Sequence, residues 1–379
     1  MKIVFTMSIL ALGLATSVSG QTPSDDAMKL EQEGNLSQAA QAWRAVTEHN
    51  PKDAGAYASL GVVLSKEEKY GEAAAAYKKA LAIDPHLPGI PLNLGLAEFK
   101  QGNFQAAIPP FKNALTVNPG SAQARILLGF SYYGVRRFRD AARQLKVATQ
   151  GDPDNLELRH ALAQSCLWAK DYSCALDEFR AVAERDPNSA GAHMLMGEAL
   201  DGLSRTPEAI AEFEKAAKTS PNEPNVHFGL GYLYWKSHRF DEAKQEFQAE
   251  LANDPQHAQA WAYLGDIEMK RDPEAALPLL RKAIQFKPDL RIAYVDLGAV
   301  LAEQKHYPDA ISAFQRAIAL EPEEPDAHFR LGRAYRATGK IAESEKEFAE
   351  VKRIHQHTEE DLARKMSPKP PEISGSETK

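Results

Sequence analysis

The chain has 379 residues, of which 44% are hydrophobic and 26% are charged, a balance that excludes wholesale disorder. The net charge is −7, whereas nucleic-acid binders and proteins that bind membranes through polybasic patches carry an excess of basic residues. We therefore expect neither a nucleic acid nor a membrane surface as the partner. Two cysteines cannot cross-link a chain of this length, so the core must come from side-chain packing.

Residues 1–20 have the pattern of a secretory signal peptide. Lys2 precedes an uncharged, largely apolar stretch from Ile3 to about Ala15, and the small residues Val18 and Gly20 precede a cleavage site before Gln21. The apolar stretch is short for a bilayer span, and no later run reaches the necessary length. We therefore expect an exported protein, periplasmic or extracellular, whose mature chain has no membrane span. An uncleaved N-terminal anchor is the alternative.

From residue 51 onward, prolines recur with an almost constant period. Seven of their eight intervals are 34 residues and one is 33, with prolines at Pro51, Pro85, Pro119, Pro153, Pro187, Pro221, Pro255, Pro288 and Pro322. Three further series keep the same period: a glycine such as Gly61, an alanine such as Ala73, and a large apolar residue four places later such as Tyr77. A fourth series of small or branched residues is interrupted only by Glu250.

Each period predicts two antiparallel helices. Apolar residues lie three or four places apart, as on one face of a helix, and a Gly or Asn near the midpoint, such as Gly102-Asn103, favours a turn. The small residues let the two backbones approach closely, and the large apolar residue fills the space between them. The proline disfavours helix at the residue before it, so the second helix ends there.

This pattern resembles the tetratricopeptide repeat family, on the basis of Tyr57-x-x-Leu60-Gly61-x-x-Leu64, followed by Tyr70, Ala73, Tyr77, Ala80 and Pro85. The resemblance implies an all-α superhelical solenoid of antiparallel helix pairs. We expect about ten repeats within residues 21–357, at 22–53, 54–87, 88–121, 122–155, 156–189, 190–223, 224–257, 258–290, 291–324 and 325–357. A capping box at Thr358 predicts a separate polar capping helix over 358–366, and the composition of 367–379 predicts a disordered tail.

No catalytic motif is present in the sequence, and we expect neither an enzyme nor a bound cofactor or metal. His193, His227 and His328 share the fourth place of their repeats with Tyr57, Trp261 and Tyr294, among other residues. We interpret this place as a packing site that tolerates an aromatic ring. Cys166 and Cys174, eight residues apart, either form a disulfide in an oxidising compartment or stay as buried free thiols.

The resemblance implies that the first helix of each repeat lines a concave groove that binds ligands. The places that would face this groove are rich in aromatic residues, namely Phe99, Phe130, Tyr133, Trp168, Phe228, Tyr232 and Trp235. They predict a trough for an apolar or amphipathic peptide. The alternative is that these side chains pack between neighbouring repeats.

Three arginines, Arg330, Arg333 and Arg336, follow at intervals of three in the tenth repeat. They form either a basic rung for carboxylates or a solvated face paired with Asp326 and nearby acids. Together these features predict an exported scaffold or adaptor that binds a protein or peptide partner. The alternative function is a structural subunit of a cell-envelope assembly or polysaccharide-export machine.

Overall fold

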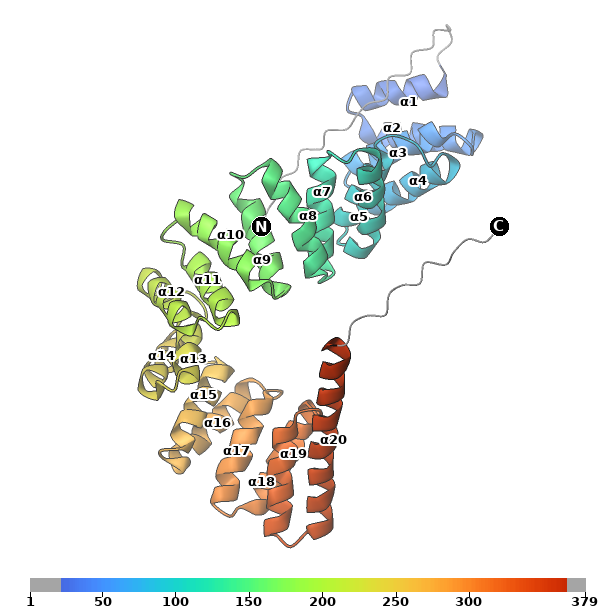
Figure 1. The fold of residues 1–379 in the computed structure, drawn as a ribbon. Coiled ribbons are helices and arrows are strands. Elements are labelled where there is room, and N and C mark those ends of the chain that lie inside the picture. Colours follow the sequence, from blue (N-terminus) through green and yellow to red (C-terminus); the bar gives the residue numbers. More distant parts are fainter. Residues whose placement is uncertain (1–21, 367–379) are drawn as a thin grey trace, which may run out of the picture. The chain divides into compact units, whose positions relative to one another are not determined.

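The computed structural model describes residues 22–366, with only the backbone for 362–366. The predicted signal peptide and tail lie outside these residues. The described chain consists of twenty α-helices and divides into two compact bodies (Figure 1). The N-terminal body contains helices α1 to α10 with residues 198–205, and the C-terminal body contains residues 188–197 and helices α12 to α20. The all-α architecture predicted from the sequence is confirmed.

The helices alternate between the first and the second member of each repeat. The first helices are α1 (Pro23–Gln32), α3 (Ala54–Lys66), α5 (Ile90–Lys100), α7 (Ala122–Gly134), α9 (Leu156–Trp168), α11 (Ala190–Gly202), α13 (Val226–Lys236), α15 (Ala258–Met269), α17 (Arg291–Glu303) and α19 (Pro325–Ala337). The second helices are α2 (Leu36–His49), α4 (Tyr70–Ile83), α6 (Phe104–Val117), α8 (Phe138–Gly151), α10 (Tyr172–Arg185), α12 (Thr206–Thr219), α14 (Phe240–Asn253), α16 (Pro273–Phe286), α18 (Tyr307–Leu320) and α20 (Ile341–Met366).

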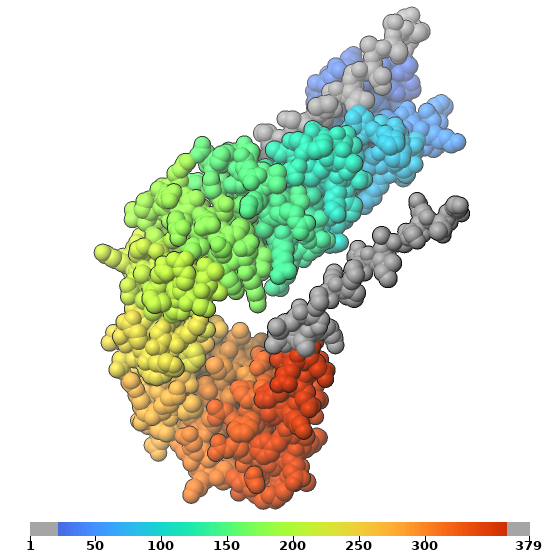
Figure 2. All heavy atoms as spheres, viewed as in Figure 1, coloured from blue at the N-terminus to red at the C-terminus, as the bar shows by residue number. Residues whose placement is uncertain are grey.

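Within each body, successive repeats pack into a continuous stack (Figure 2). The second helix of one repeat contacts the first helix of the next, as α16 contacts α17. First helices of successive repeats also touch, α3 with α5 and α5 with α7 in the N-terminal body, and α15 with α17 and α17 with α19 in the C-terminal body. We call the surface that α13, α15, α17 and α19 form the first-helix face of the C-terminal body.

Close approach within a helix pair requires glycine at the periodic positions. A Cβ atom added to Gly298 would lie 2.6 Å from the ring of Phe314, which is 1% exposed. A Cβ atom on Gly95 would likewise lie 2.6 Å from the ring of Phe111. The large residue of each second helix therefore occupies the space that the glycine leaves, as the sequence predicts.

The fourth place makes polar links of two kinds in seven of the repeats. In three repeats the histidine Nδ1 lies 2.6 Å from the carboxylate of a glutamate in the second helix, in the pairs His193–Glu212, His227–Glu246 and His328–Glu347. In five repeats the fourth side chain forms a hydrogen bond with the carbonyl oxygen of the proline six residues earlier. These side chains are Arg125, Arg159, Trp261, Tyr294 and His328.

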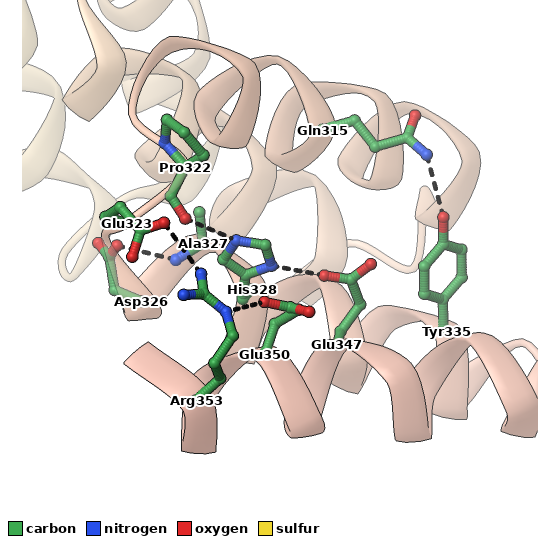
Figure 3. Close-up of polar contacts among 10 residues, drawn as sticks. All are labelled: Gln315, Pro322, Glu323, Asp326, Ala327, His328, Tyr335, Glu347, Glu350 and Arg353. Atoms are coloured by element: carbon green, nitrogen blue, oxygen red, sulfur yellow. Dashed lines mark hydrogen bonds and ion pairs between the residues drawn. The ribbon is translucent and has the colours of Figure 1, made fainter. Parts of the chain in front are cut away.

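His328 shows both links (Figure 3). The interpretation of this place as a packing site for a ring is therefore incomplete. These five side chains share an N–H or O–H at their tips, which satisfies a carbonyl of the turn between repeats.

The structure corrects the prediction of a separate capping helix. Helix α20 runs without a break from Ile341 to Met366, and the Thr358 hydroxyl donates to the Ile354 carbonyl within that helix instead of capping a new one. No proline or glycine lies between Ile354 and Thr358 to end the helix. The Arg353 guanidinium donates a hydrogen bond to Glu323 Oε1 at 2.9 Å, which links α20 to the turn between α18 and α19 (Figure 3).

A search of the described helices for a membrane span found none with the length and apolarity that crossing a bilayer requires.

Candidate functional site

The start of α13 is fixed by a buried carboxylate. Asn225 adopts a left-handed conformation with φ of 67° and its side chain does not cap the helix. Instead, Glu250 from α14, which is 2% exposed, accepts hydrogen bonds from the backbone N–H groups of Asn225 at 3.1 Å and Phe228 at 3.0 Å. Glu250 breaks the periodic small-residue series because it satisfies these two donors, which have no partner in their own helix.

Helix α13 carries three predicted groove residues, and the structure brings them together through a fourth ring. Phe228, Tyr232 and Trp235 all lie within ring-contact distance of Tyr263 on α15, with centroid separations of 5.9, 5.8 and 5.0 Å. Tyr232 also stacks on Trp235 at 6.0 Å. We call these four residues, all partly exposed, the aromatic cluster.

Carboxylates border the aromatic cluster. The Trp235 indole N–H donates to Asp266 Oδ2 at 2.6 Å, which fixes the ring plane. Burial, with smaller effects of Tyr232, Asp266 and Asp296, raises the pKa of Tyr263 to about 12. The Tyr263 phenol therefore stays neutral at physiological pH and can donate a hydrogen bond.

Asp296 on α17 is buried without a hydrogen-bond partner for its Oδ2, and the residue is 6% exposed. Burial first, and then the charge of Asp266, raises the pKa of Asp296 to about 7, against the smaller opposing effects of Arg330, Lys270 and Arg291. The site thus combines a rigid aromatic surface with two carboxylates, one of which is buried and not hydrogen-bonded.

The three arginines of the tenth repeat are exposed on α19. None of Arg330, Arg333 and Arg336 forms an ion pair with another described residue. Asp326, the expected partner, pairs instead with Arg291. The alternative in which these three arginines pair with Asp326 is therefore wrong, because Arg291 of the preceding repeat occupies that carboxylate. Arg330 lies near enough to Asp296 to affect its titration.

In the N-terminal body the predicted residues do not form one surface. Phe99 packs edge-on against Phe104 and Phe111 of its own repeat, at 5.2 and 6.5 Å. Phe130 is partly buried, and Tyr133 packs against Phe138 at 5.4 Å. For Phe99 this geometry fits packing inside the repeat more closely than a role in a trough.

Trp168 is the most exposed of the predicted aromatic residues, at 57%. It packs on Phe138 at 6.1 Å and borders an open surface depression of about 390 Å³. The other residues around this depression are mainly basic, namely Arg136, Arg137, Phe138, Arg139, Asp140, Ala169 and Lys170. Its surroundings are therefore cationic, unlike the acidic border of the aromatic cluster.

Cys166 on α9 and Cys174 on α10 form a disulfide in the structure, with Cα atoms 5.8 Å apart. Asp171 lies close enough to both sulfurs to share a metal ion with them. Because metal binding requires thiolates, the disulfide and such a site are mutually exclusive.

Tyr263, Asp266 and Asp296 were not predicted from the sequence. Tyr263 and Asp296 occupy the sixth place of their repeats, where the described repeats before Tyr263 carry Ala27, Ser59, Asn93, Leu127, Ala161, Leu195 and Gly229. The available signal was Asp296, the one acidic residue at this place, which Arg330 occupies in the tenth repeat.

These helix pairs and their periodic contacts define a helical repeat protein. One family model described as tetratricopeptide repeat matches residues 27–88, 92–130, 228–290 and 295–357, and a second model of that description matches 133–199. Since the matches cover more than half of the chain, it belongs to the tetratricopeptide repeat family.

Two solved structures share this fold with TM-scores of at least 0.50. The Cut9–Hcn1 hetero-tetramer of APC/C matches with a TM-score of 0.52 and 14% identity, over 91% of this chain and 83% of that chain. The Naa15/Naa10 complex bound to HypK-THB matches with a TM-score of 0.50 and 16% identity, over 88% of this chain and 63% of that chain. Yeast Tom70 matches with a TM-score of 0.44 and 15% identity, over 90% of this chain and 93% of that chain. A search of curated proteins found no match.

Proposed function

We propose that the protein is an exported scaffold or adaptor that binds a protein or peptide partner through the first-helix face of its C-terminal body, without a catalytic step. The observation that carries this proposal is the aromatic cluster. It presents four partly exposed rings from two successive repeats on one surface. Clustered Trp and Tyr side chains are typical of the residues that dominate protein–protein binding energy.

The cluster is ordered before any partner arrives. The Trp235 ring is held by its hydrogen bond to Asp266 and by contact with Tyr263. Glu250 fixes the first turn of α13, which positions Phe228. Binding therefore need not order these side chains, which lowers the entropic cost of association.

Export is supported by two independent features. The sequence of residues 1–20 has the pattern of a signal peptide, and Cys166 and Cys174 are joined in the structure. Structural disulfides persist mainly in oxidising compartments such as the periplasm or the extracellular space.

Site-specific photo-crosslinking tests both parts of the proposal. A photoreactive p-benzoylphenylalanine is introduced for Tyr232 in one variant and for Phe286, an exposed ring at the end of the second helix α16, in the control. We expect the Tyr232 variant to crosslink a polypeptide in the extracytoplasmic fraction and the control to crosslink little. Equal crosslinking from both positions would contradict the binding surface, and recovery of the protein in the cytoplasm would contradict export.

The identity of the crosslinked species also separates this function from the alternative. A subunit of an envelope machine would crosslink membrane proteins with which it co-purifies stably, whereas an adaptor would crosslink polypeptides that dissociate during purification.

A further inference from the structure

A second surface of the protein combines positive charge with an exposed aromatic ring, in the fourth and fifth repeats. The depression beside Trp168 adjoins another of about 460 Å³, and the two share Arg139, Ala169 and Lys170. We call the two together the basic depression. All of its residues belong to the N-terminal body, so it is separate from the first-helix face of the C-terminal body.

The larger depression has an apolar bottom that is held in place covalently. Leu162 and Cys166 of α9, each 1% exposed, lie at this bottom between the second helices α8 and α10. The disulfide from Cys166 to Cys174 closes the short segment that carries Trp168 and Lys170. This link restricts the backbone of the segment, so a ligand need not order it on binding.

Cations outnumber acids around the basic depression by six to two. The cations are Arg136, Arg137, Arg139, Arg143, Lys146 and Lys170, and the acids are Asp140 and Asp171. Asp140 pairs with Arg137 at 2.6 Å and with Arg143 at 3.6 Å. Asp171 accepts the backbone N–H of Cys174 at 3.2 Å and so caps α10. Both acids are thus already engaged within the chain.

Four of the six cations, Arg136, Arg139, Lys146 and Lys170, are exposed and form no ion pair with another described residue. Like charges that are held close together repel, so their concentration costs free energy that a negatively charged ligand would offset. Because the whole chain has a net charge of −7, this local excess is not a consequence of its composition.

The repeat fold does not require a cation at the position of Arg139, which stands two residues before the periodic alanine Ala141. The eight other repeats that have this alanine carry at the same place Ser37, Gly71, Gln105, Ser173, Pro207, Asp241, Glu274 and Pro308. Packing therefore does not explain the arginine.

We propose that the basic depression binds an acidic segment of a polypeptide, whose carboxylates pair with Arg139 and Lys170 while an apolar side chain packs on Trp168. Arg139 and Lys170 border both depressions, so a chain that crosses from one to the other passes them. Arginine and lysine form charge-assisted hydrogen bonds with carboxylates. Trp168, which is 57% exposed and packs on Phe138, is a ring of the kind that contributes most to interface energy.

The shape of this surface favours a polypeptide over an anionic membrane. Leu162 and Cys166 lie at the bottom of a hollow between helices, which a side chain enters and a flat lipid surface does not. The inference goes beyond the proposed function, because it adds a second binding surface on a different body of the chain.

Selection from a random peptide library, on the wild type and on Arg139→Gln/Lys170→Gln, tests the inference. We expect the wild type to enrich a set of peptides that the variant does not enrich, and these peptides to share acidic residues next to an apolar one. A set without acidic residues, or no difference between the two proteins, would overturn the inference. Peptides that the variant still enriches bind outside the basic depression, and one such selected peptide serves to test the aromatic cluster.

The affinity of one acidic peptide from the first set locates the contact. Arg139→Gln/Lys170→Gln should bind it at least about tenfold more weakly, because charge-assisted hydrogen bonds are lost. The control Lys52→Gln/Lys112→Gln removes two exposed lysines of the same body and should bind as the wild type does. Equal losses in both variants would indicate a general effect of net charge and would overturn the inference.

Sedimentation with phosphatidylglycerol vesicles separates a polypeptide ligand from a membrane. We expect the wild type to stay in the supernatant at physiological salt. Sedimentation of the wild type with the vesicles that is lost in Arg139→Gln/Lys170→Gln would assign the basic depression to a membrane surface and overturn the inference.

Discussion

Replacing Asp296 by asparagine is expected to stabilise the C-terminal body at about pH 8 by up to roughly 4 kcal/mol, and by less than half as much at about pH 5. The reason is the burial of a carboxylate without a partner. In the folded protein the pKa of Asp296 is about 7, compared with an ordinary value of 3.8. The folded chain therefore binds this proton more tightly than the unfolded chain.

The sign of the pH dependence follows from that difference. Between about pH 4 and pH 7 the unfolded state has lost the proton and the folded state retains it, so the free energy of unfolding falls as pH rises. Above pH 7 both states are ionised and the full penalty applies. Asparagine has nearly the same shape as aspartate but no charge, so the variant does not incur the free-energy cost of burying an ionised carboxylate.

Thermal unfolding of wild type and Asp296→Asn at both pH values measures the effect. Asp309→Asn, an exposed carboxylate, is the control and should behave as the wild type does. A variant that is less stable than the wild type at pH 8 would show that Asp296 has a counter-ion in solution, for which Arg330, the cation with the largest effect on the pKa of Asp296, is the candidate.

Replacing Glu250 by alanine is expected to destabilise the C-terminal body by about 2–3 kcal/mol. Alanine is the residue that the repeat period favours here, as at Ala216 and Ala283, so the sequence pattern alone predicts a neutral or stabilising change. The structure predicts the reverse, because the substitution leaves the N–H groups of Asn225 and Phe228 without acceptors.

Chemical denaturation with amide hydrogen exchange checks this prediction. Exchange at Asn225 and Phe228 should accelerate in Glu250→Ala as the first turn of α13 frays. Glu250→Gln retains one acceptor oxygen and should recover part of the loss. An unchanged or raised free energy of unfolding in Glu250→Ala would mean that the cap contributes nothing.

The fold was predictable because the same contact between a glycine and a large apolar residue recurs from repeat to repeat. Gly298 and Phe314 are 16 residues apart in the chain, and their contact recurs in nearly every repeat, so the period exposes it. The end of the array was not predictable in the same way. A capping-box pattern at Thr358 also fits the interior of a helix, and only the unbroken hydrogen bonding of α20 decides between the two.

The candidate site was predictable only in part. Tyr232 and Trp235 lie on one helix at places that the family resemblance assigns to the groove. Tyr263 and Asp266 come from the next repeat and Asp296 from the one after, so their approach depends on how successive repeats are rotated against each other. That rotation results from many small contacts and has no local sequence signal.

The affinity of one selected peptide for two matched variants tests the central claim most directly. Trp235→Ala removes a ring from the aromatic cluster, and Phe286→Ala removes an exposed ring from a second helix. With folding of both verified by circular dichroism, we expect Trp235→Ala to bind at least about tenfold more weakly, the loss typical of an interface tryptophan, and Phe286→Ala to bind as the wild type does. Equal affinity of all three proteins would contradict binding through the first-helix face.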